Sequence, residues 1–270
     1  MVGALLAFYA FVIGALVGSF LNVVIYRYPR EQSVMNPPRS YCPSCGATIR
    51  WYDNIPILSY LALRGRCRRC GEGISSRYPL VELANALFYM AIYLRVGMDV
   101  VFIPLAAIVS MTIVLIYIDL DIQILPDVID LPGIAIGIWI GAMSVDRELT
   151  NLFLATSWID SAAGAAFGAG IILLISLVYK LIRRIEGMGQ GDIKMMAMIG
   201  AVVGWKAVVP VLLLASLSGS IFGIAMAIRT KTNLQVALPF GVFLGLAFLL
   251  VMFFGNAAAD WMPYQPPEIG

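Results

Sequence analysis

Residues 100–127, VVFIPLAAIVSMTIVLIYIDLDIQILPD, hold the two features that decide the fold: a long apolar run and the acidic residues that follow it. The run from 100 to 118 has the length of about 20 apolar residues that a helix needs to cross a lipid bilayer. Because lipid offers no partner to backbone polar groups, such a run is predicted to be a helix. The stretch therefore predicts a membrane helix that ends in a cluster of carboxylates.

The rest of the chain is comparably apolar. Of its 270 residues, 61% are hydrophobic and 13% are charged, more apolar surface than a water-soluble fold can bury. The apolar runs are continuous, whereas a membrane barrel would alternate apolar and polar residues. We therefore expect an all-α polytopic membrane protein.

Eight apolar segments are long enough to be candidate membrane helices, although the sixth is short. They are residues 3–26, 79–95, 100–118, 124–143, 160–182, 193–205, 207–228 and 234–255. The first lacks a basic start and a small-residue cleavage site, so we expect it to be retained and not removed as a signal peptide. The sixth is expected to begin earlier, at the glycines before Asp192.

The basic residues predict the orientation. If all eight segments span, fifteen of the eighteen Lys and Arg residues fall on the odd-numbered connections. The positive-inside bias makes that face cytoplasmic and leaves both termini outside the cytoplasm. The basic insert between the first two helices is expected to contact anionic lipid headgroups. No nucleic-acid partner is expected.

All four cysteines lie in this insert, as Cys42-Pro-Ser-Cys45 and Cys67-Arg-Arg-Cys70, and each pair is followed by a glycine. This spacing is typical of a structural zinc site with four cysteine ligands, and the alternatives are two disulfides or four inert thiols. A reducing cytoplasmic compartment disfavours disulfides. The expected organisation is a first helix over 1–26, a zinc-binding domain over 27–78 and a membrane domain over 79–270.

Acidic residues gather at the cytoplasmic ends of the membrane helices. Asp119, Asp121, Asp127 and Asp130 surround one junction, and Asp192 starts the sixth helix at the same depth. Two carboxyls that meet in a low-dielectric site share one proton, which is the chemistry of an aspartic peptidase. Acids at helix starts also stabilise the helix dipole without any catalytic role. The chain has no histidine, which excludes the Ser-His and Cys-His hydrolytic arrangements.

Three glycines precede Asp192, at positions 187, 189 and 191. They are consistent with a flexible hinge, or with a bare backbone against which an extended substrate strand lies. No strand precedes them, so they are not a dinucleotide-binding loop.

Several motifs together resemble the type IV prepilin peptidases, the GxGD class of intramembrane aspartic proteases. They are GSFLNVVIYR at 18–27, the paired CxxC module, RYPLVEL at 77–83, the Asp119 segment ending in Leu125-Pro126-Asp127, and GQGDIK at 189–194. The resemblance implies that Asp119 and Asp192 are the catalytic pair, with Asp127, Gly189 and Gly191 in support. The outer stretch from Ser144 to Trp158 is longer than expected for this family.

The resemblance implies a protein of the bacterial inner membrane that cuts basic leaders from type IV prepilins and from the pseudopilins of type II secretion. Such enzymes often also methylate the new N-terminus with S-adenosylmethionine. The residues themselves do not show this second activity. Glu82 is a weak candidate for it, and a helix-start acid is the plainer interpretation.

Three alternatives stay open at this point. The acids could carry ions in a transporter or channel, although they gather at one membrane edge and not at the midplane. The chain could be an assembly scaffold that docks through its zinc module, or a peptidase without methyltransferase activity. The oligomeric state is also undetermined, because the small residues at 164–170 allow close helix packing within one chain or between chains.

Overall fold

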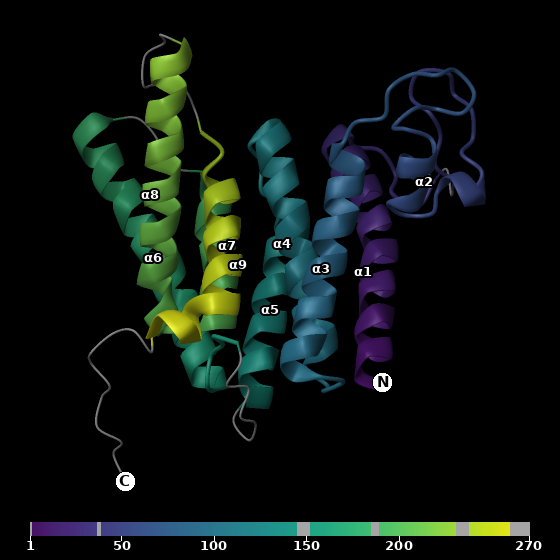
Figure 1. The fold of residues 1–270 in the computed structure, drawn as a ribbon. Coiled ribbons are helices and arrows are strands. Elements are labelled where there is room, and N and C mark those ends of the chain that lie inside the picture. The colour runs from purple at the N-terminus through teal and green to yellow at the C-terminus, as the bar shows by residue number, and fades with distance from the viewer. Residues whose placement is uncertain (1, 37–38, 145–151, 185–188, 231–237, 260–270) are drawn as a thin grey trace. The chain divides into compact units, whose positions relative to one another are not determined.

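The structure is a computed structural model that describes residues 2–36, 39–144, 152–184, 189–230 and 238–259 (Figure 1). In these ranges the protein is helical, with two isolated β-bridges and no strand. The long helices are α1 (Val2–Arg27), α3 (Arg77–Val96), α4 (Phe102–Ile122), α5 (Asp127–Ser144), α6 (Trp158–Arg183), α7 (Gln190–Val203), α8 (Trp205–Thr230) and α9 (Phe240–Ala259). The insert carries η1 (Tyr28–Arg30), η2 (Trp51–Asp53) and α2 (Leu58–Ala62). The predicted all-α class, with a small insert after the first membrane helix, is confirmed.

Six helices in the described ranges are long and apolar enough to cross a membrane: α1, α3, α4, α5, α6 and α8. The apolar part of α9 is shorter, and α7 has only 14 residues. As expected, α7 begins among the glycines, at Gln190. Residues 195–203 of α7 are all buried, and α5, α6, α8 and α9 pack against this helix. A helix enclosed by its neighbours does not have to match the thickness of the lipid, which accounts for its short length.

The chain forms two compact units, Met1–Ile118 and Asp119–Gly270, and the boundary falls within α4. The boundaries expected from the sequence, at 26/27 and 78/79, separate the first helix, the insert and the membrane domain. They differ from the division between these two units at 118/119. They stay a prediction.

In the first unit, α1 and α3 pack closely because glycines of α1 face α3. A Cβ at Gly14 would lie 2.8 Å from the Cα of Ala86, so only glycine allows this approach. A buried polar chain joins three helices. The Asn85 side-chain nitrogen donates to the Gly14 carbonyl at 2.8 Å, and the Ser110 hydroxyl donates to Asn85 Oδ1 at 2.9 Å. Buried polar groups that are all paired in this way hold helices in one register.

In the second unit, glycines set the contact between α6 and α7. A Cβ at Gly164 would collide with the Gly200 carbonyl, and one at Gly168 would lie 2.6 Å from the Met196 carbonyl oxygen. These small residues therefore pack within one chain, which answers part of the question left open by the sequence. The long outer stretch after α5 lies partly outside the described residues. Its described end is held by backbone bonds from Phe153 to Met252 and from Ala155 to Val202, both at 2.9 Å.

Candidate functional site

Asp119 lies in the last turn of α4 and is 4% exposed. Its Oδ2 accepts a hydrogen bond of 3.0 Å from the backbone N–H of Val242, and the N–H of Gly241 also donates to the carboxylate. Both donors belong to the first turn of α9, where backbone N–H groups have no partner inside the helix. The start of α9 is thus an anion-binding site for Asp119. This explains how an acid is tolerated at the end of an apolar helix.

Asp192 is in the first turn of α7 and is partly exposed. Its carboxylate accepts from the backbone N–H of Gly189, the residue that caps the helix. An acid at the third helical position that reaches back to the cap is half of a capping box. Asp192 therefore makes the helix-capping contact that the sequence allowed for acids at helix starts. This contact fixes the position of its carboxylate.

The side chain of Leu125 connects the two helix starts. A Cβ on Gly191 would lie 2.7 Å from Leu125 Cβ, and one on Gly241 would lie 3.1 Å from Leu125 Cδ1 and 2.9 Å from Asp119 Oδ2. The carboxylates of Asp119 and Asp192 are close enough for their charges to interact. The structure therefore brings together the two acids that the sequence placed at one membrane edge.

The glycines before Asp192 differ among themselves. Gly191 is covered by Leu125, so its bare backbone makes an internal contact and is not open to a substrate strand. Gly189 has extended backbone angles, and among the described residues only Asp192 Oδ2 and the Gly191 nitrogen lie within 4 Å of its would-be Cβ. Gly187 lies outside the described residues. Among the described glycines of this motif, space for an approaching chain is therefore found at Gly189 alone.

The other acids of this edge have different surroundings. Asp127 forms an ion pair with Lys194 at 2.6 Å, which joins the start of α5 to the first turns of α7. Asp121 is exposed. Asp130 is fully buried, and neither of its carboxylate oxygens has a hydrogen-bond partner among the described residues. Burying a carboxyl group without a hydrogen-bond partner costs free energy of folding. Asp130 is therefore the acid of this cluster that is expected to destabilise the fold.

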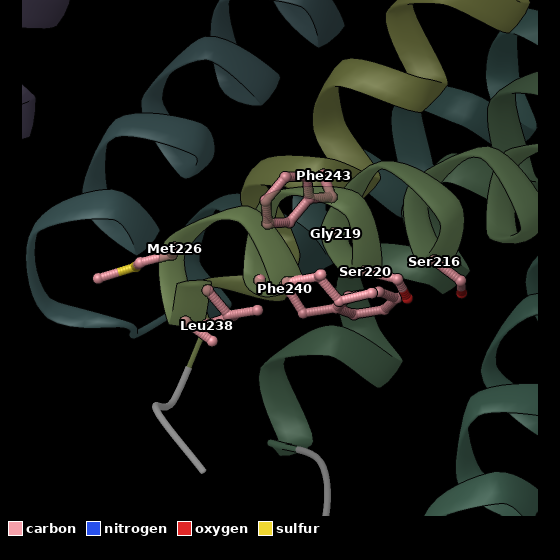
Figure 2. Close-up of a pocket in the computed structure, with 10 residues that line it drawn as sticks. Ser216, Gly219, Ser220, Met226, Leu238, Phe240 and Phe243 are labelled. Carbon is pink, nitrogen blue, oxygen red and sulfur yellow. The ribbon is translucent and has the colours of Figure 1, made fainter. Parts of the chain in front are cut away.

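A groove of about 450 Å³ lies between α8 and α9 (Figure 2). Small residues of α8 line one side, and the rings of Phe240 and Phe243 line the other. Phe240 directly precedes Gly241, so the groove begins next to the backbone that holds Asp119. Neither this groove nor the role of residues 240–242 was foreseen, because backbone donors and small apolar residues carry no signature in the sequence.

The four cysteines of the insert converge. Their sulfurs all lie within 4.8 Å of one another, and those of Cys42 and Cys70 are 3.9 Å apart. Tetrahedral coordination with metal–sulfur bonds of about 2.3 Å separates the sulfurs by about 3.8 Å. All four thiols are free, so neither CxxC pair forms a disulfide. This cluster can hold a metal ion.

The backbone around the sulfurs suits metal-binding thiolates. Gly46 and Gly71, each one residue after a CxxC pair, have φ of 66° and 74°, which glycine adopts readily. Their N–H groups donate to the carbonyls of Cys42 and Cys67 at 2.9 Å. The backbone N–H groups of Cys70 and Arg69 also donate to the Cys67 sulfur, which stabilises its thiolate, the form that binds metals.

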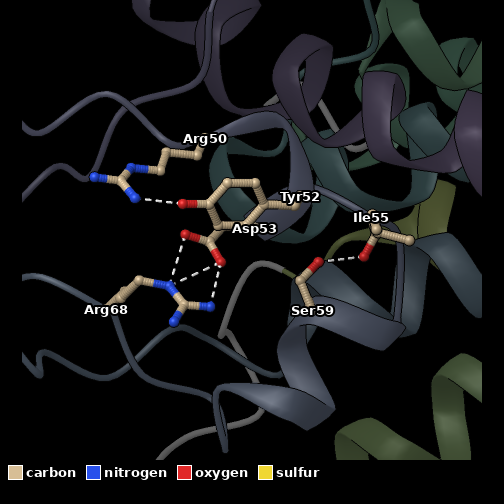
Figure 3. A network of polar contacts seen from close by, with 6 residues as sticks. All are labelled: Arg50, Tyr52, Asp53, Ile55, Ser59 and Arg68. Atoms are coloured by element: carbon tan, nitrogen blue, oxygen red, sulfur yellow. Dashed lines mark hydrogen bonds and ion pairs between the residues drawn. The ribbon is translucent and has the colours of Figure 1, made fainter.

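Polar contacts hold the insert together between the two cysteine pairs (Figure 3). Arg68, from within the second pair, forms an ion pair with Asp53 at 2.7 Å. Arg50 donates to the Tyr52 hydroxyl, and Ser59 donates to the Ile55 carbonyl. These contacts join the second cysteine pair to the segment that leads into α2.

Two family models match successive parts of the chain. The model of the bacterial peptidase A24 N-terminal domain matches residues 12–96, and that of the type IV leader peptidase family matches residues 106–224. No solved structure matches the chain.

Several relatives carry the name prepilin leader peptidase/N-methyltransferase. One from Myxococcus xanthus is 43% identical over 84% of this chain and 65% of its own length. Those from Pseudomonas putida and Pseudomonas aeruginosa are 36% and 35% identical, over 92% and 90% of this chain and 90% and 89% of their own lengths. On this evidence of sequence and family models, the chain belongs to the type IV leader peptidase family.

Proposed function

We propose that this protein is a membrane endopeptidase that removes the leader peptides of type IV prepilins and pseudopilins, with Asp119 and Asp192 as its catalytic pair. The observation that carries the proposal is the meeting of the α4 end with the starts of α7 and α9 around Leu125. Family membership supports the reaction class, and the names of the relatives support the substrate class.

The chemistry follows from two carboxyls that share one proton. The ionised member takes a proton from water, and the resulting hydroxide adds to the scissile carbonyl carbon. The protonated member donates a hydrogen bond to the carbonyl oxygen. When the C–N bond breaks, the leaving amine takes a proton from the pair, which returns to its starting state. The amides of Gly241 and Val242 keep Asp119 in place throughout.

In this proposal the pair lies at the same depth in the membrane as the cleavage point of a prepilin. A prepilin has a short basic leader followed by an apolar helix, so the bond to be cut lies at the cytoplasmic edge of the bilayer. The basic residues of this chain gather on the same side, which implies that both termini lie outside the cytoplasm. Asp127 supports the site through Lys194, which follows Asp192 by two residues.

The cysteine cluster of the insert binds zinc as a structural ion in this proposal. Four thiolates close the coordination shell, so the ion stabilises the insert and leaves no position for a substrate. Methylation of the new N-terminus, with S-adenosylmethionine as donor, is the second activity, and the names of the relatives support it.

The decisive experiment incubates the pure protein with a prepilin and S-adenosylmethionine and measures the product by mass spectrometry. We expect loss of the leader followed by a gain of one methyl group. Asp119→Asn and Asp192→Asn should each abolish leader removal, while circular dichroism and zinc content stay at the parental level.

Undiminished cleavage by either variant would exclude the pair. Cleavage without a methyl gain would support a peptidase alone. Ion flux into liposomes in the absence of any cleavage would support the transporter alternative.

A further inference from the structure

The insert between α1 and α3 presents large apolar side chains on its surface. Trp51 of η2 is 81% exposed, and Leu58 and Leu61 of α2 are 63% and 65% exposed. A single exposed apolar residue is ordinary, but these three lie on two short elements that contact each other. Exposed apolar surface that is grouped in this way marks an interaction site. We call Trp51, Leu58 and Leu61 the insert patch.

The two sides of α2 have different surroundings. Ser59 is buried, and Tyr60 and Leu63 line a cavity of about 940 Å³ that is also bounded by the end of α1 and the start of α3. The insert patch does not line this cavity as the described residues form it. Leu58 and Leu61 are three positions apart, so they lie on one side of the helix. That side of α2 therefore faces away from the rest of the unit.

The helices next to the insert determine the depth of α2 in the membrane. Arg27 ends α1 and Arg77 begins α3, and arginines at the ends of membrane helices lie where lipid meets water. The backbone N–H of Ile57, the residue before α2, donates to Glu82 Oε2 at 2.7 Å. Glu82 follows Arg77 by five residues, which is about 7 Å along a helix. The start of α2 is therefore held closer to the membrane interior than these arginines are.

The contacts of α1 lead to the same depth. The insert lies alongside the last third of α1 and not beyond its end (Figure 1), because the cavity is lined by Ser19, Asn22, Val23 and Tyr26. A Cβ on Gly18 would lie 2.8 Å from Glu82 Cα, so these two residues are level with each other. The headgroup layer is about 5–8 Å thick on each side of a bilayer. A segment at the level of Glu82 therefore reaches the acyl chains.

The charge of the insert also suits a lipid surface. Residues 27–78 contain nine arginines and three acids, which gives a net charge of +6. Arg50 and Arg64, which stand on either side of the patch segment in the sequence, are exposed. Tryptophan and leucine on one surface with arginines around them are the composition of a segment that lies in a membrane interface. Anionic headgroups complement this charge.

We infer that the insert patch is a membrane anchor, in which Trp51, Leu58 and Leu61 enter the lipid leaflet beside α1 at the boundary between headgroups and acyl chains. The charge pattern of the sequence predicted contact between the insert and headgroups. The structure adds which side chains enter the lipid and the depth at which they lie. The anchor holds the metal-binding insert at the membrane surface, and this role goes beyond the proposed enzymatic activities.

The test measures the contact of Trp51 with lipid. The full-length protein is reconstituted at a low protein-to-lipid ratio into liposomes of phosphatidylcholine and phosphatidylglycerol. Bromine on the acyl chains quenches tryptophan fluorescence on contact. The chain has five tryptophans, so the signal of Trp51 is the difference between the parent and Trp51→Phe. We expect bromine to remove most of this signal and iodide in the water to leave it nearly unchanged.

Trp139→Phe provides the reference for a tryptophan in lipid. Trp139 is 41% exposed and lies in α5, a candidate membrane helix. The same subtraction gives the quenching of its signal by bromine. The quenching of Trp51 should be of comparable size.

The double variant Leu58→Asp/Leu61→Asp should release the patch, because carboxylates are costly among acyl chains. Quenching of Trp51 by bromine should fall to a small fraction of its parental value, and quenching by iodide should rise. Met35→Asp is the matched control, since Met35 is an apolar residue of the same insert, 80% exposed, outside η2 and α2. It should behave like the parent. Circular dichroism and the thermal unfolding midpoint report whether each variant is folded. If the double variant is not, the measurement on the parent still decides the matter.

Three results would overturn the inference. Quenching of Trp51 by iodide and not by bromine would place the patch in water. Quenching by neither would show that protein covers it, either a second copy of the chain or another partner. Parental quenching by bromine in the folded double variant would show that the two leucines do not anchor the insert. The experiment uses no substrate, so its outcome is independent of the proposed peptidase activity.

Discussion

The backbone N–H of Val242 donates a hydrogen bond of 3.0 Å to the carboxylate of Asp119, a residue 123 positions earlier in the chain. The contact places the acid that ends α4 on the first turn of α9. Because the donors are backbone groups, their position depends on how closely α9 approaches α4, and that approach depends on Gly241. The geometry of the proposed catalytic pair is therefore set by residues that have no reactive side chain.

Gly241→Ala should strongly reduce leader cleavage. The added methyl would lie 2.9 Å from Asp119 Oδ2 and 3.1 Å from Leu125 Cδ1, so the carboxylate has to move. A displacement of about 1 Å can lower an enzymatic rate about a hundredfold. The measurement is kcat/KM on a prepilin in membranes. Parental activity in this variant would show that the contact with α9 does not position Asp119.

Gly191→Ala should act in the same direction from the side of Asp192, because its methyl would lie 2.7 Å from Leu125 Cβ. Gly170→Ala is the matched control: Gly170 lies in α6 of the same unit, and no atom of the described residues lies within 4 Å of its would-be Cβ. The control should cleave like the parent. If Gly191→Ala and Gly170→Ala lost cleavage activity equally, the cause would be a general effect of alanine in a helix and not a change at the site.

Asp130→Val should raise the free energy of unfolding by about 1–3 kcal/mol, because it removes a buried carboxyl without a hydrogen-bond partner in the described part of the chain. The check is the thermal unfolding midpoint in detergent, with leader cleavage measured in parallel. We expect cleavage to be retained. A more stable protein that no longer cleaves would instead place Asp130 in the catalytic machinery.

Cys67→Ser should release the metal and lower the abundance of the protein. Structural zinc sites contribute on the order of 10–16 kcal/mol of binding free energy to the fold that they hold. Zinc per chain, measured by atomic absorption, and protein yield from membranes provide the check. Ser44→Ala, a change between Cys42 and Cys45, is the control. Normal accumulation of Cys67→Ser with the parental zinc content would contradict the structural-metal proposal.

Asp127→Asn and Lys194→Met should each change the rate of leader cleavage only slightly. Their ion pair is partly exposed, with side-chain exposures of 57% and 32% respectively. Such pairs contribute about 0–1 kcal/mol, which corresponds to at most about a fivefold change in cleavage. If the ion pair is the only role of these two residues, the double variant should lose no more cleavage activity than either single variant. A loss far greater for Asp127→Asn would assign this acid a direct part in the reaction.

Composition and spacing were sufficient for the class of fold, the cysteine cluster and the family. Apolar runs of membrane length leave the backbone one solution, a helix, and four cysteines in two CxxC pairs can meet on one ion with little help from the rest of the chain. The comparisons confirm the family that the motifs indicated. The start of α7 at Gln190 was also foreseen, from the glycines and the shortness of the apolar run.

The sequence by itself determined which residue types are present, and it predicted that the acids gather at one membrane edge, because hydropathy and charge act locally along the chain. It could not show that Asp119 is held by the first turn of α9, that Leu125 covers Gly191, or that Asp130 is buried without a partner among the described residues. Those facts depend on backbone donors and on the close approach of helices far apart in sequence. Only the tertiary structure decided them, since neither a backbone N–H nor a contact distance is encoded in any single side chain.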